Sequence, residues 1–223
     1  MVSATYRTHS HLPSRVVSST RGRRSYLPSP VFLLLSARYL PGMPTYVRWR
    51  EAGATYFFTV VTYHRRRIFT DQAVQRLLRD SLVSVRRRLP FDLLAFVLLP
   101  EHLHCIWSMP DGDDDFPTRW RQIKALFTRA YLRAGGSDRE VTPQERHQGR
   151  RGIWQPRYWE HRIRDEKDYL QHRDYIHLNP VRHGYVERPE EWPWSSFHRH
   201  VRVAWLDPHW PGSSPVDLPV VQE

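Results

Sequence analysis

The sequence predicts an α+β fold in which helices pack on one face of an antiparallel sheet. Two observations support this prediction. Short runs of β-branched and aromatic residues alternate with longer stretches in which apolar residues recur every three or four positions, so strands and helices follow one another. Two of the strands are separated by only a few residues, which requires a hairpin and therefore antiparallel pairing. When helices pack on one side of such a sheet, the apolar face of each helix and the apolar face of the sheet bury each other.

The first half of this pattern lies between residues 55 and 109. Residues 55–63 (TYFFTVVTY) are β-branched and aromatic throughout, which is typical of a strand. Asp71 is a suitable N-cap for a helix that ends at about Arg88, because apolar residues recur at helical spacing after it. Residues 92–99 and 103–109 are apolar runs on either side of a Pro-Glu break, and we predict that they form the hairpin.

The second half contains two helices and one strand. Residues 118–134 carry an apolar stripe that predicts a helix, and the charged, Gly-rich residues 135–152 predict a surface loop without regular structure. Residues 153–163 look like a fourth strand, with a proline that marks an edge or a bulge. A third helix is predicted over residues 165–179, closed by Pro180. The resulting order, βαββαβα, is that of the ferredoxin-like arrangement.

One domain, residues 43–191, is predicted between two extensions. Residues 1–42 are rich in Ser, Arg and Pro and show no periodicity, which predicts disorder. Met43 stands directly before the first orderly stretch, so we expect translation to start there; the alternative is a basic arm that binds nucleic acid. Residues 192–223 form a Trp/Pro-rich tail that we expect to lie against the surface of the domain.

The charge of the chain indicates a polyanionic partner. Formal net charge is +11, but residues 1–42 hold six arginines and no acidic residue, which leaves +5 for residues 43–223. Nucleic acid is therefore the predicted partner, with a merely solvated basic surface as the alternative. No apolar run approaches the roughly 20 residues that span a membrane. The single cysteine, Cys105, excludes an internal disulfide and indicates a reducing compartment, so we expect a cytoplasmic protein.

Two histidines open the second strand of the hairpin, in the segment LPEHLHCIW. His102 and His104 are two positions apart, so in a strand both point to one side and Leu103 to the other. Two neighbouring imidazoles can share a divalent cation, whereas the alternative is a pair of ordinary half-buried histidines. The same spacing occurs elsewhere in polar surroundings without a strand pattern, at His9/His11 and His198/His200.

The predicted third helix adds a nucleophile and a further ligand. Tyr175 and Asn179 are four residues apart and share one face of the helix. A phenol, two imidazoles and an amide oxygen are suited to phosphodiester transesterification, in which the tyrosine attacks a phosphate and forms a covalent phosphotyrosine. Such ligands suit Mn²⁺ or Mg²⁺, and the ligand types do not exclude Zn²⁺. Tyr169 is a rival nucleophile, but the residue four positions later is Arg173, which is no metal ligand.

Five segments together closely resemble the REP-associated tyrosine transposases of the single-tyrosine HUH superfamily. They occur in the family's order between about residues 43 and 200: LPEHLHCIW, FPTRWRQIK, IWQPRYWEHRIRDEKDY, YIHLNPVRHGYV and WPWSSFHRH. The resemblance implies a ferredoxin-like nuclease fold and a metal held at His102 and His104. It also implies Tyr175 as the nucleophile that forms a 5′-phosphotyrosine, and Asn179 in the position of the third ligand.

The resemblance also implies a substrate. Members of the family cleave and rejoin single-stranded DNA at repetitive extragenic palindromes, which fold as hairpins, so association with the nucleoid follows. A flexible tail can lie near the active site in this family, which implies that residues 192–223 modulate access. The family pattern lacks residues 1–42, which favours a start at Met43.

DNA contacts are predicted where basic residues stand beside aromatic ones, because guanidinium groups meet phosphates and bases stack on rings. The candidates are Arg65, Arg66, Arg119, Arg121, Lys124, Arg157 and Trp159. Each of them alone is also explained as a solvated charge or a packing residue. Two other functions stay open: a ferredoxin-like domain that binds nucleic acid without cutting it, as RRM-type domains do, and a metallohydrolase that activates water. The sequence does not decide between a monomer and a homodimer.

Overall fold

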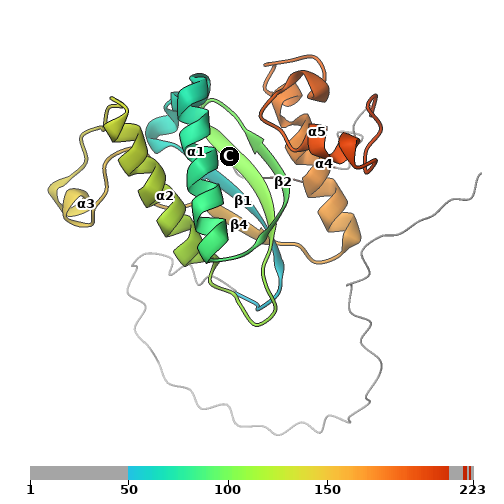
Figure 1. Ribbon diagram of the computed structural model, residues 1–223, viewed down its shortest axis with the longest axis horizontal. Helices are drawn as coiled ribbons and strands as arrows, with labels where there is room; N and C mark the ends of the chain where they lie inside the picture. The colour runs from blue at the N-terminus through green and yellow to red at the C-terminus, as the bar shows by residue number, and fades with distance from the viewer. Residues whose placement is uncertain (1–49, 211–217, 220, 222–223) are drawn as a thin grey trace, which may run out of the picture. The chain divides into compact units, whose positions relative to one another are not determined.

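The computed structural model describes residues 50–210, 218, 219 and 221, so the predicted extension over residues 1–42 and the predicted start at Met43 lie outside it. The described residues contain one four-stranded antiparallel sheet with the strand order β2-β3-β1-β4 (Figure 1). The strands are β1 (Thr55–Val61), β2 (Asp92–Leu98), β3 (His102–Ser108) and β4 (Trp159–Arg162).

Five α-helices accompany the sheet in the part of the chain that the structure describes: α1 (Gln72–Arg88), α2 (Phe116–Arg133), α3 (Pro143–His147), α4 (Glu166–Arg182) and α5 (Phe197–Arg202). Short 3₁₀ helices cover Tyr63–Arg65, Ile68–Thr70 and Pro189–Glu191. Asp71 caps α1 as predicted, since its side chain accepts a hydrogen bond from the amide of Ala73. None of the described helices combines the length and the apolar composition needed to cross a membrane.

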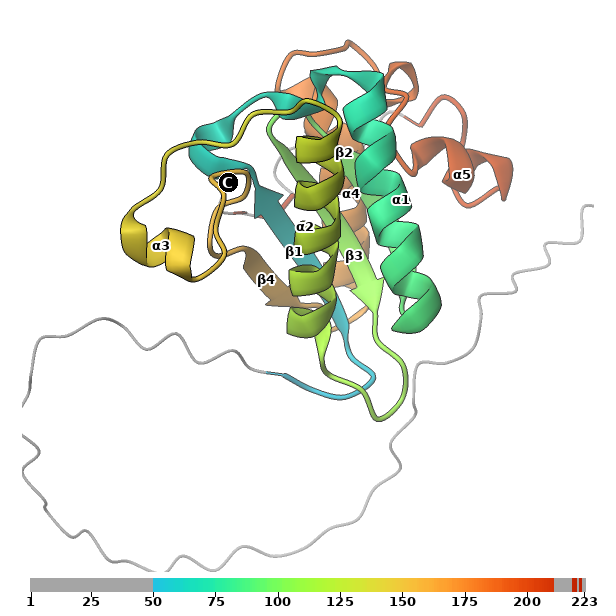
Figure 2. The same ribbon diagram turned by 60° about the vertical axis from the view of Figure 1, so that its left-hand side comes forward.

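The helices cover both faces of the sheet. Figure 2 shows α1 and α2 on one side of the strands and α4 on the other. Successive residues of β1 explain this arrangement, because Phe58 belongs to the cluster under α1 and α2 whereas Phe57 belongs to the cluster under α4, and both are fully buried. The α+β class and the antiparallel sheet are confirmed. The prediction that all helices pack on one face was wrong for α4, since strands that are apolar on both sides need cover on both sides.

Aromatic rings fill the space between the sheet and the helices α1 and α2. The ring of Trp107 stacks on Trp120 at 4.3 Å and on Phe91 at 4.0 Å, measured between centroids. Trp107 is fully buried, and burial of such a side chain stabilises the fold by about 2–3 kcal/mol. Cys105 is also buried in this cluster.

The edge strand β2 is covered by residues that follow α4. The amide of Leu98 donates to the carbonyl of Trp194 at 2.9 Å, and the amide of Ser196 donates to the carbonyl of Phe96 at 2.8 Å. The indole of Trp192 adds a bond to the carbonyl of Leu98. This short run of the predicted tail therefore pairs with β2 almost as a further strand would.

Three element boundaries differ from the predictions. The region 135–152 contains α3, because Thr142 and Glu145 form a capping box that starts a helix there. Only residues 159–162 of the predicted strand 153–163 pair with β1. Helix α4 continues past Pro180 to Arg182, since a proline in the last turn removes a single hydrogen bond.

Candidate active site

The two histidines of β3 lie side by side on the face of the sheet that α4 covers. The rings of His102 and His104 are 4.8 Å apart between centroids, and both side chains are fully buried. Leu103 points the other way, into the cluster under α1 and α2. The strand alternation that the sequence predicts is therefore what places both imidazoles on one side.

Each histidine is oriented through its Nδ1 atom. Nδ1 of His102 lies 3.0 Å from a carboxylate oxygen of Glu101, and Nδ1 of His104 lies 3.0 Å from the hydroxyl of Thr59, its cross-strand neighbour. An ionised carboxylate can only accept, so Nδ1 of His102 carries the proton and Nε2 keeps its lone pair. That Nε2 atom is buried and has no hydrogen-bond partner among the described residues. A buried imidazole lone pair of this kind is a suitable metal ligand.

Glu101 is held in its ionised form although it is buried. Burial by itself would raise the pKa of this carboxyl, but the hydrogen bond from His102 and the nearby imidazole of His183 outweigh it, so the pKa of Glu101 falls below its usual value. The hydroxyl of Tyr185 lies 3.4 Å from the second carboxylate oxygen. The guanidinium of Arg65 lies 3.8 Å from the first.

Helix α4 places Tyr175 against the histidines. The ring of Tyr175 is 5.2 Å from the ring of His104 and 6.0 Å from the ring of Phe57, between centroids. The guanidinium of Arg182 lies over the tyrosine ring, 4.9 Å from its centroid. Asn179 follows one helical turn after Tyr175 and is fully buried. The structure therefore brings the phenol and the imidazole pair together on one side of the sheet.

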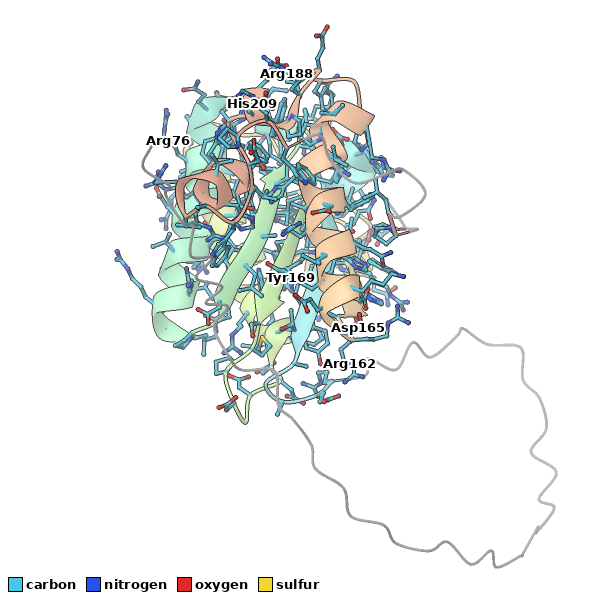
Figure 3. The ribbon with its side chains drawn as sticks, turned by 90° about the vertical axis from the view of Figure 1, so that its right-hand side faces the viewer. Arg76, Arg162, Asp165, Tyr169, Arg188 and His209 are labelled. Atoms are coloured by element: carbon cyan, nitrogen blue, oxygen red, sulfur yellow. The ribbon has the colours of Figure 1, made fainter. Side chains whose placement is uncertain are left out.

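The site is closed in the described structure. Tyr175 is 1% exposed, and Leu218 and Val221 near the end of the chain pack against the apolar cluster to which it belongs. Tyr169, the rival tyrosine, lies on α4 two turns earlier and is half-buried at the margin of that cluster (Figure 3). Burial raises the pKa of Tyr169, which opposes its action as a nucleophile.

The donor atoms of the site fit a divalent cation. The imidazoles of His102 and His104 stand on β3, and the side-chain amide of Asn179 stands on the face of α4 that carries Tyr175. The buried Nε2 atom of His102 is the observation that supports this fit, because burying an imidazole nitrogen without a partner costs free energy unless a ligand occupies it.

A second cluster, formed by His161, Asp168 and His172, has ligand atoms within 4.8 Å of one another. Its hydrogen bonds are already made: Nδ1 of His172 bonds to the carbonyl of Asp168 at 2.8 Å, and Nε2 of His161 bonds to the carboxylate at 2.9 Å. The rings of His161 and His172 are stacked on each other, with 14° between their planes. Burial alone would raise the pKa of Asp168, but hydrogen bonds from His161 and Arg164 lower it to about 2. This cluster therefore fastens the start of α4 to β4.

The predicted DNA-binding residues fall into two groups. Arg65, Arg121 and Arg157 are exposed, and Lys124 and Trp159 are half-buried. Arg66 is half-buried and donates to carbonyls of Gly152 and Ser137, which fastens the loop before β4.

Arg119 was predicted to contact DNA from the exposed face of its helix, together with Arg121 and Lys124, and this placement is wrong for Arg119 because its side chain is buried. It is 1% exposed, and its guanidinium bonds to the Asp113 carboxylate at 2.6 Å and to the Pro90 carbonyl at 2.8 Å. A buried guanidinium that is satisfied by its own chain is a packing residue.

Several residues of the site were not found from the sequence: Thr59, Glu101, Arg182 and His183. The register between β1 and β3 could have identified Thr59, because residue 59 stands opposite residue 104. Glu101 directly precedes the first histidine, and this position was interpreted only as part of a turn. Arg182 and His183 come from the end of α4, where the predicted stop at Pro180 hid them.

The chain is similar to named proteins over most of its length, although no protein-family model matches it. It is 44% identical over 171 residues to the REP-associated tyrosine transposase of Escherichia coli (strain K12), which covers 76% of this chain and 92% of that relative. A relative from Haemophilus influenzae, named for the same family, is 36% identical over 171 residues, covering 77% of this chain and 95% of its own length. The solved structure of a REP-associated tyrosine transposase bound to a REP hairpin is 40% identical, with a TM-score of 0.65, and the match covers 81% of this chain and all of that one.

Proposed function

The chain belongs to the REP-associated tyrosine transposases, and we propose that it cleaves and rejoins single-stranded DNA beside a hairpin, with Tyr175 as the nucleophile. The observation that supports this proposal is the position of the phenol ring, 5.2 Å from the ring of His104 on the buried side of β3. Buried polar groups that converge in this way are typical of reaction centres.

In the proposed reaction the hydroxyl oxygen of Tyr175 attacks a backbone phosphorus. A bond from that oxygen to phosphorus forms, and the bond from phosphorus to the 3′ oxygen of the preceding nucleotide breaks. The phenol proton is lost and the leaving 3′ oxygen gains a proton, so the products are a 5′-phosphotyrosine and a free 3′ hydroxyl. The reverse reaction with another 3′ hydroxyl joins strands without an external energy source.

His102, His104 and Asn179 are the residues that would hold a divalent cation, Mg²⁺ or Mn²⁺. When bound, such a cation polarises a non-bridging phosphate oxygen and stabilises the charge that develops there. Glu101 keeps the proton of His102 on Nδ1, which leaves Nε2 directed to the ligand side. Arg182, over the tyrosine ring, adds a fixed positive charge close to the attacked phosphate.

The substrate follows from the relatives and from charge. A family member is known in complex with a REP hairpin, and the domain here carries a net positive charge. We assign the DNA contacts to those predicted residues that have side chains at the surface: Arg65, Arg121, Lys124, Arg157 and Trp159. Such a substrate would place the protein at the nucleoid.

The proposal is tested with a labelled hairpin oligonucleotide carrying unpaired flanks, incubated with protein and Mn²⁺ and separated on a denaturing gel. Wild-type protein should form a covalent protein–DNA adduct. Tyr175→Phe should lower adduct formation by at least about 1,000-fold, because no other group supplies the nucleophile. Tyr169→Phe is the matched control and should form the adduct at the wild-type rate.

The same gel separates the other functions. A protein that only binds nucleic acid gives neither adduct nor cut strand. A metallohydrolase gives cut strand without adduct. Adduct formation by Tyr175→Phe would show that another residue is the nucleophile.

A further inference from the structure

Thr59 places a hydroxyl in an interior strand of the sheet, on the face that α4 covers. The residues two positions before and after it, Phe57 and Val61, are apolar, and Thr59 itself is 1% exposed. Burying a hydroxyl costs free energy unless it forms a hydrogen bond. Among the described residues this hydroxyl has one hydrogen-bond partner, Nδ1 of His104 at 3.0 Å.

The ring of His104 is held by packing, and Thr59 acts on one of its nitrogens. The cross-strand neighbours of His104 are Thr59 on β1 and Val97 on β2, and the side chain of Val97 cannot form a hydrogen bond. The ring of Phe57 stacks on the imidazole at 5.5 Å, with 25° between the planes. The ring of Tyr175 approaches it edge-on at 5.2 Å. These contacts fix where the ring lies, whereas the hydroxyl acts on its proton.

The two histidines of the candidate site have unlike partners at Nδ1. Nδ1 of His102 meets the carboxylate of Glu101, which can only accept a hydrogen bond, so the proton of His102 stays on Nδ1. A hydroxyl can accept or donate, so Thr59 is compatible with a proton on either nitrogen of His104. The hydrogen bond from Thr59 therefore does not tie His104 to one tautomer.

The two tautomers of His104 suit different conditions. A buried hydroxyl with one partner is satisfied as a donor when it gives its hydrogen to Nδ1, and the proton of His104 then lies on Nε2. A cation needs the lone pair of Nε2, which requires the proton on Nδ1 and the hydroxyl as acceptor. Rotation of the hydroxyl about its Cβ–Oγ1 bond makes this change without moving the ring.

We propose that Thr59 is a positioning residue that holds Nδ1 of His104 in place and lets the proton of the imidazole change nitrogen. Without a cation Nε2 carries the proton, and with a cation Nδ1 carries it and donates to Thr59. One proton leaves Nε2 for solvent and another is taken up at Nδ1, so the imidazole stays neutral. The inference rests on the proposed function for the role of His104 as a ligand. It makes His102 a ligand of fixed tautomer and His104 the ligand that responds to the cation.

The test records two-bond ¹H–¹⁵N correlation spectra, which show which nitrogen of each imidazole carries the proton. Protein in EDTA is compared with protein in Zn²⁺, a diamagnetic cation that imidazoles bind well. His102→Gln and His104→Gln assign the signals. His104 should carry its proton on Nε2 in EDTA and on Nδ1 in Zn²⁺, whereas His102 should carry it on Nδ1 in both. The same tautomer of His104 in both conditions would overturn the proposal.

Thr59→Val separates positioning from packing, because valine has nearly the shape of threonine but no hydroxyl. It should weaken Mn²⁺ binding by about 10-fold in a calorimetric titration, since Nδ1 then has no acceptor on β1. Thr59→Ser restores the hydroxyl and should recover most of the affinity. Thr62→Val is the matched control, because it removes a buried hydroxyl that bonds to the carbonyls of Arg66 and Glu101. It should leave both the Mn²⁺ affinity and the tautomer of His104 unchanged.

Two outcomes of the titrations would also overturn the proposal. One is Mn²⁺ affinity in Thr59→Val equal to that of the wild type. The other is an equal loss of affinity in Thr62→Val, which would assign the effect to the packing of β1. None of these measurements uses DNA, so a wild-type protein that forms no adduct would refute the proposed reaction and leave the result on Thr59 standing.

Discussion

The two faces of the sheet are built from the same strands and are both partly apolar, but only one of them carries buried polar groups at its centre. On the side of α1 and α2, β3 presents Leu103, Cys105 and Trp107 to a cluster of apolar and aromatic side chains. On the side of α4, the alternate residues of β3 are His102, His104 and Ile106, and the helix above them contributes polar groups that are almost fully buried. Both faces therefore bury apolar side chains, but only the face under α4 also carries the candidate chemistry, at a cost in desolvation.

This difference shows how a small domain separates stability from function. Strand alternation directs neighbouring residues into different environments, so a reactive side chain can follow a packing side chain with no loop between them. Packing under α1 and α2 fixes the backbone of β1 and β3, and this also fixes the side chains that the same strands present to α4. Substitutions on the two faces should consequently affect different measurements.

The largest effect is expected from Trp107→Ala. Removing an indole that stacks on two other rings should lower the free energy of unfolding by about 3–5 kcal/mol, measured by urea denaturation. His104→Ala, three residues earlier on the other face, should cost less stability. It should weaken Mn²⁺ binding by at least about 10-fold in a calorimetric titration, because it removes one ligand.

The comparison of the two faces would fail in either of two cases. One is a greater loss of stability for His104→Ala than for Trp107→Ala. The other is Mn²⁺ affinity that is unchanged by His104→Ala.

A smaller effect is expected from pH, and it should come from the side of α4. Nε2 of His177 on α4 and Nδ1 of His200 on α5 are 3.0 Å apart, and Nε2 of His200 donates to the carbonyl of Leu94. Burial, helped by nearby positive charge, lowers the pKa of His177 well below its usual value and that of His200 to about 4. Both imidazoles are therefore neutral in the folded protein at pH 7.

Between pH 6.5 and 4 the unfolded chain binds protons that the folded chain excludes, so stability falls as the pH is lowered through this range. For His200 alone the loss should reach about 2 kcal/mol at pH 5. Urea denaturation at pH 7.5, 6 and 5 measures it, with His200→Gln as the comparison. A variant that lost stability as steeply as the wild type would place the pH dependence elsewhere. The carboxyl of Asp168, with its pKa lowered to about 2, contributes stability that is lost only at still lower pH.

The smallest effect is expected from the residues that cover the candidate site. Leu218 and Val221 pack against the cluster that contains Tyr175, so L218S/V221S should favour an open site. Adduct formation should then be about two- to tenfold faster, as the closed population falls. The stability of the domain should hardly change. A slower reaction in the variant would mean that these residues help to build the site.

The sequence predicted the local geometry of the site well and its surroundings less well. Period-two alternation was enough to place His102 and His104 together, and helical spacing was enough to pair Tyr175 with Asn179. The position of α4 on the face opposite α1 and α2 could have been inferred from β1, because the residues of β1 are apolar on both faces of the strand. The burial of Arg119 could not have been inferred from the sequence, because its partner Asp113 comes from a loop whose path depends on the tertiary fold.

Long-range pairing decided what the sequence left open. The cavity between α2 and residues 146–158 is lined by residues of a helix and of a distant loop. Neither the helical pattern nor the loop sequence alone indicates a cavity there. The link between His177 and His200 likewise joins two helices whose separate sequences show no common motif.

Covering β2 with residues 192–200 has a consequence for self-association. An exposed strand edge is a template on which another copy of the chain can add its own strand, and this is a common start of aggregation. Here the backbone groups of Phe96 and Leu98 are already engaged by Ser196 and Trp194. Growth of the sheet from copy to copy is therefore blocked at this edge by the protein's own chain.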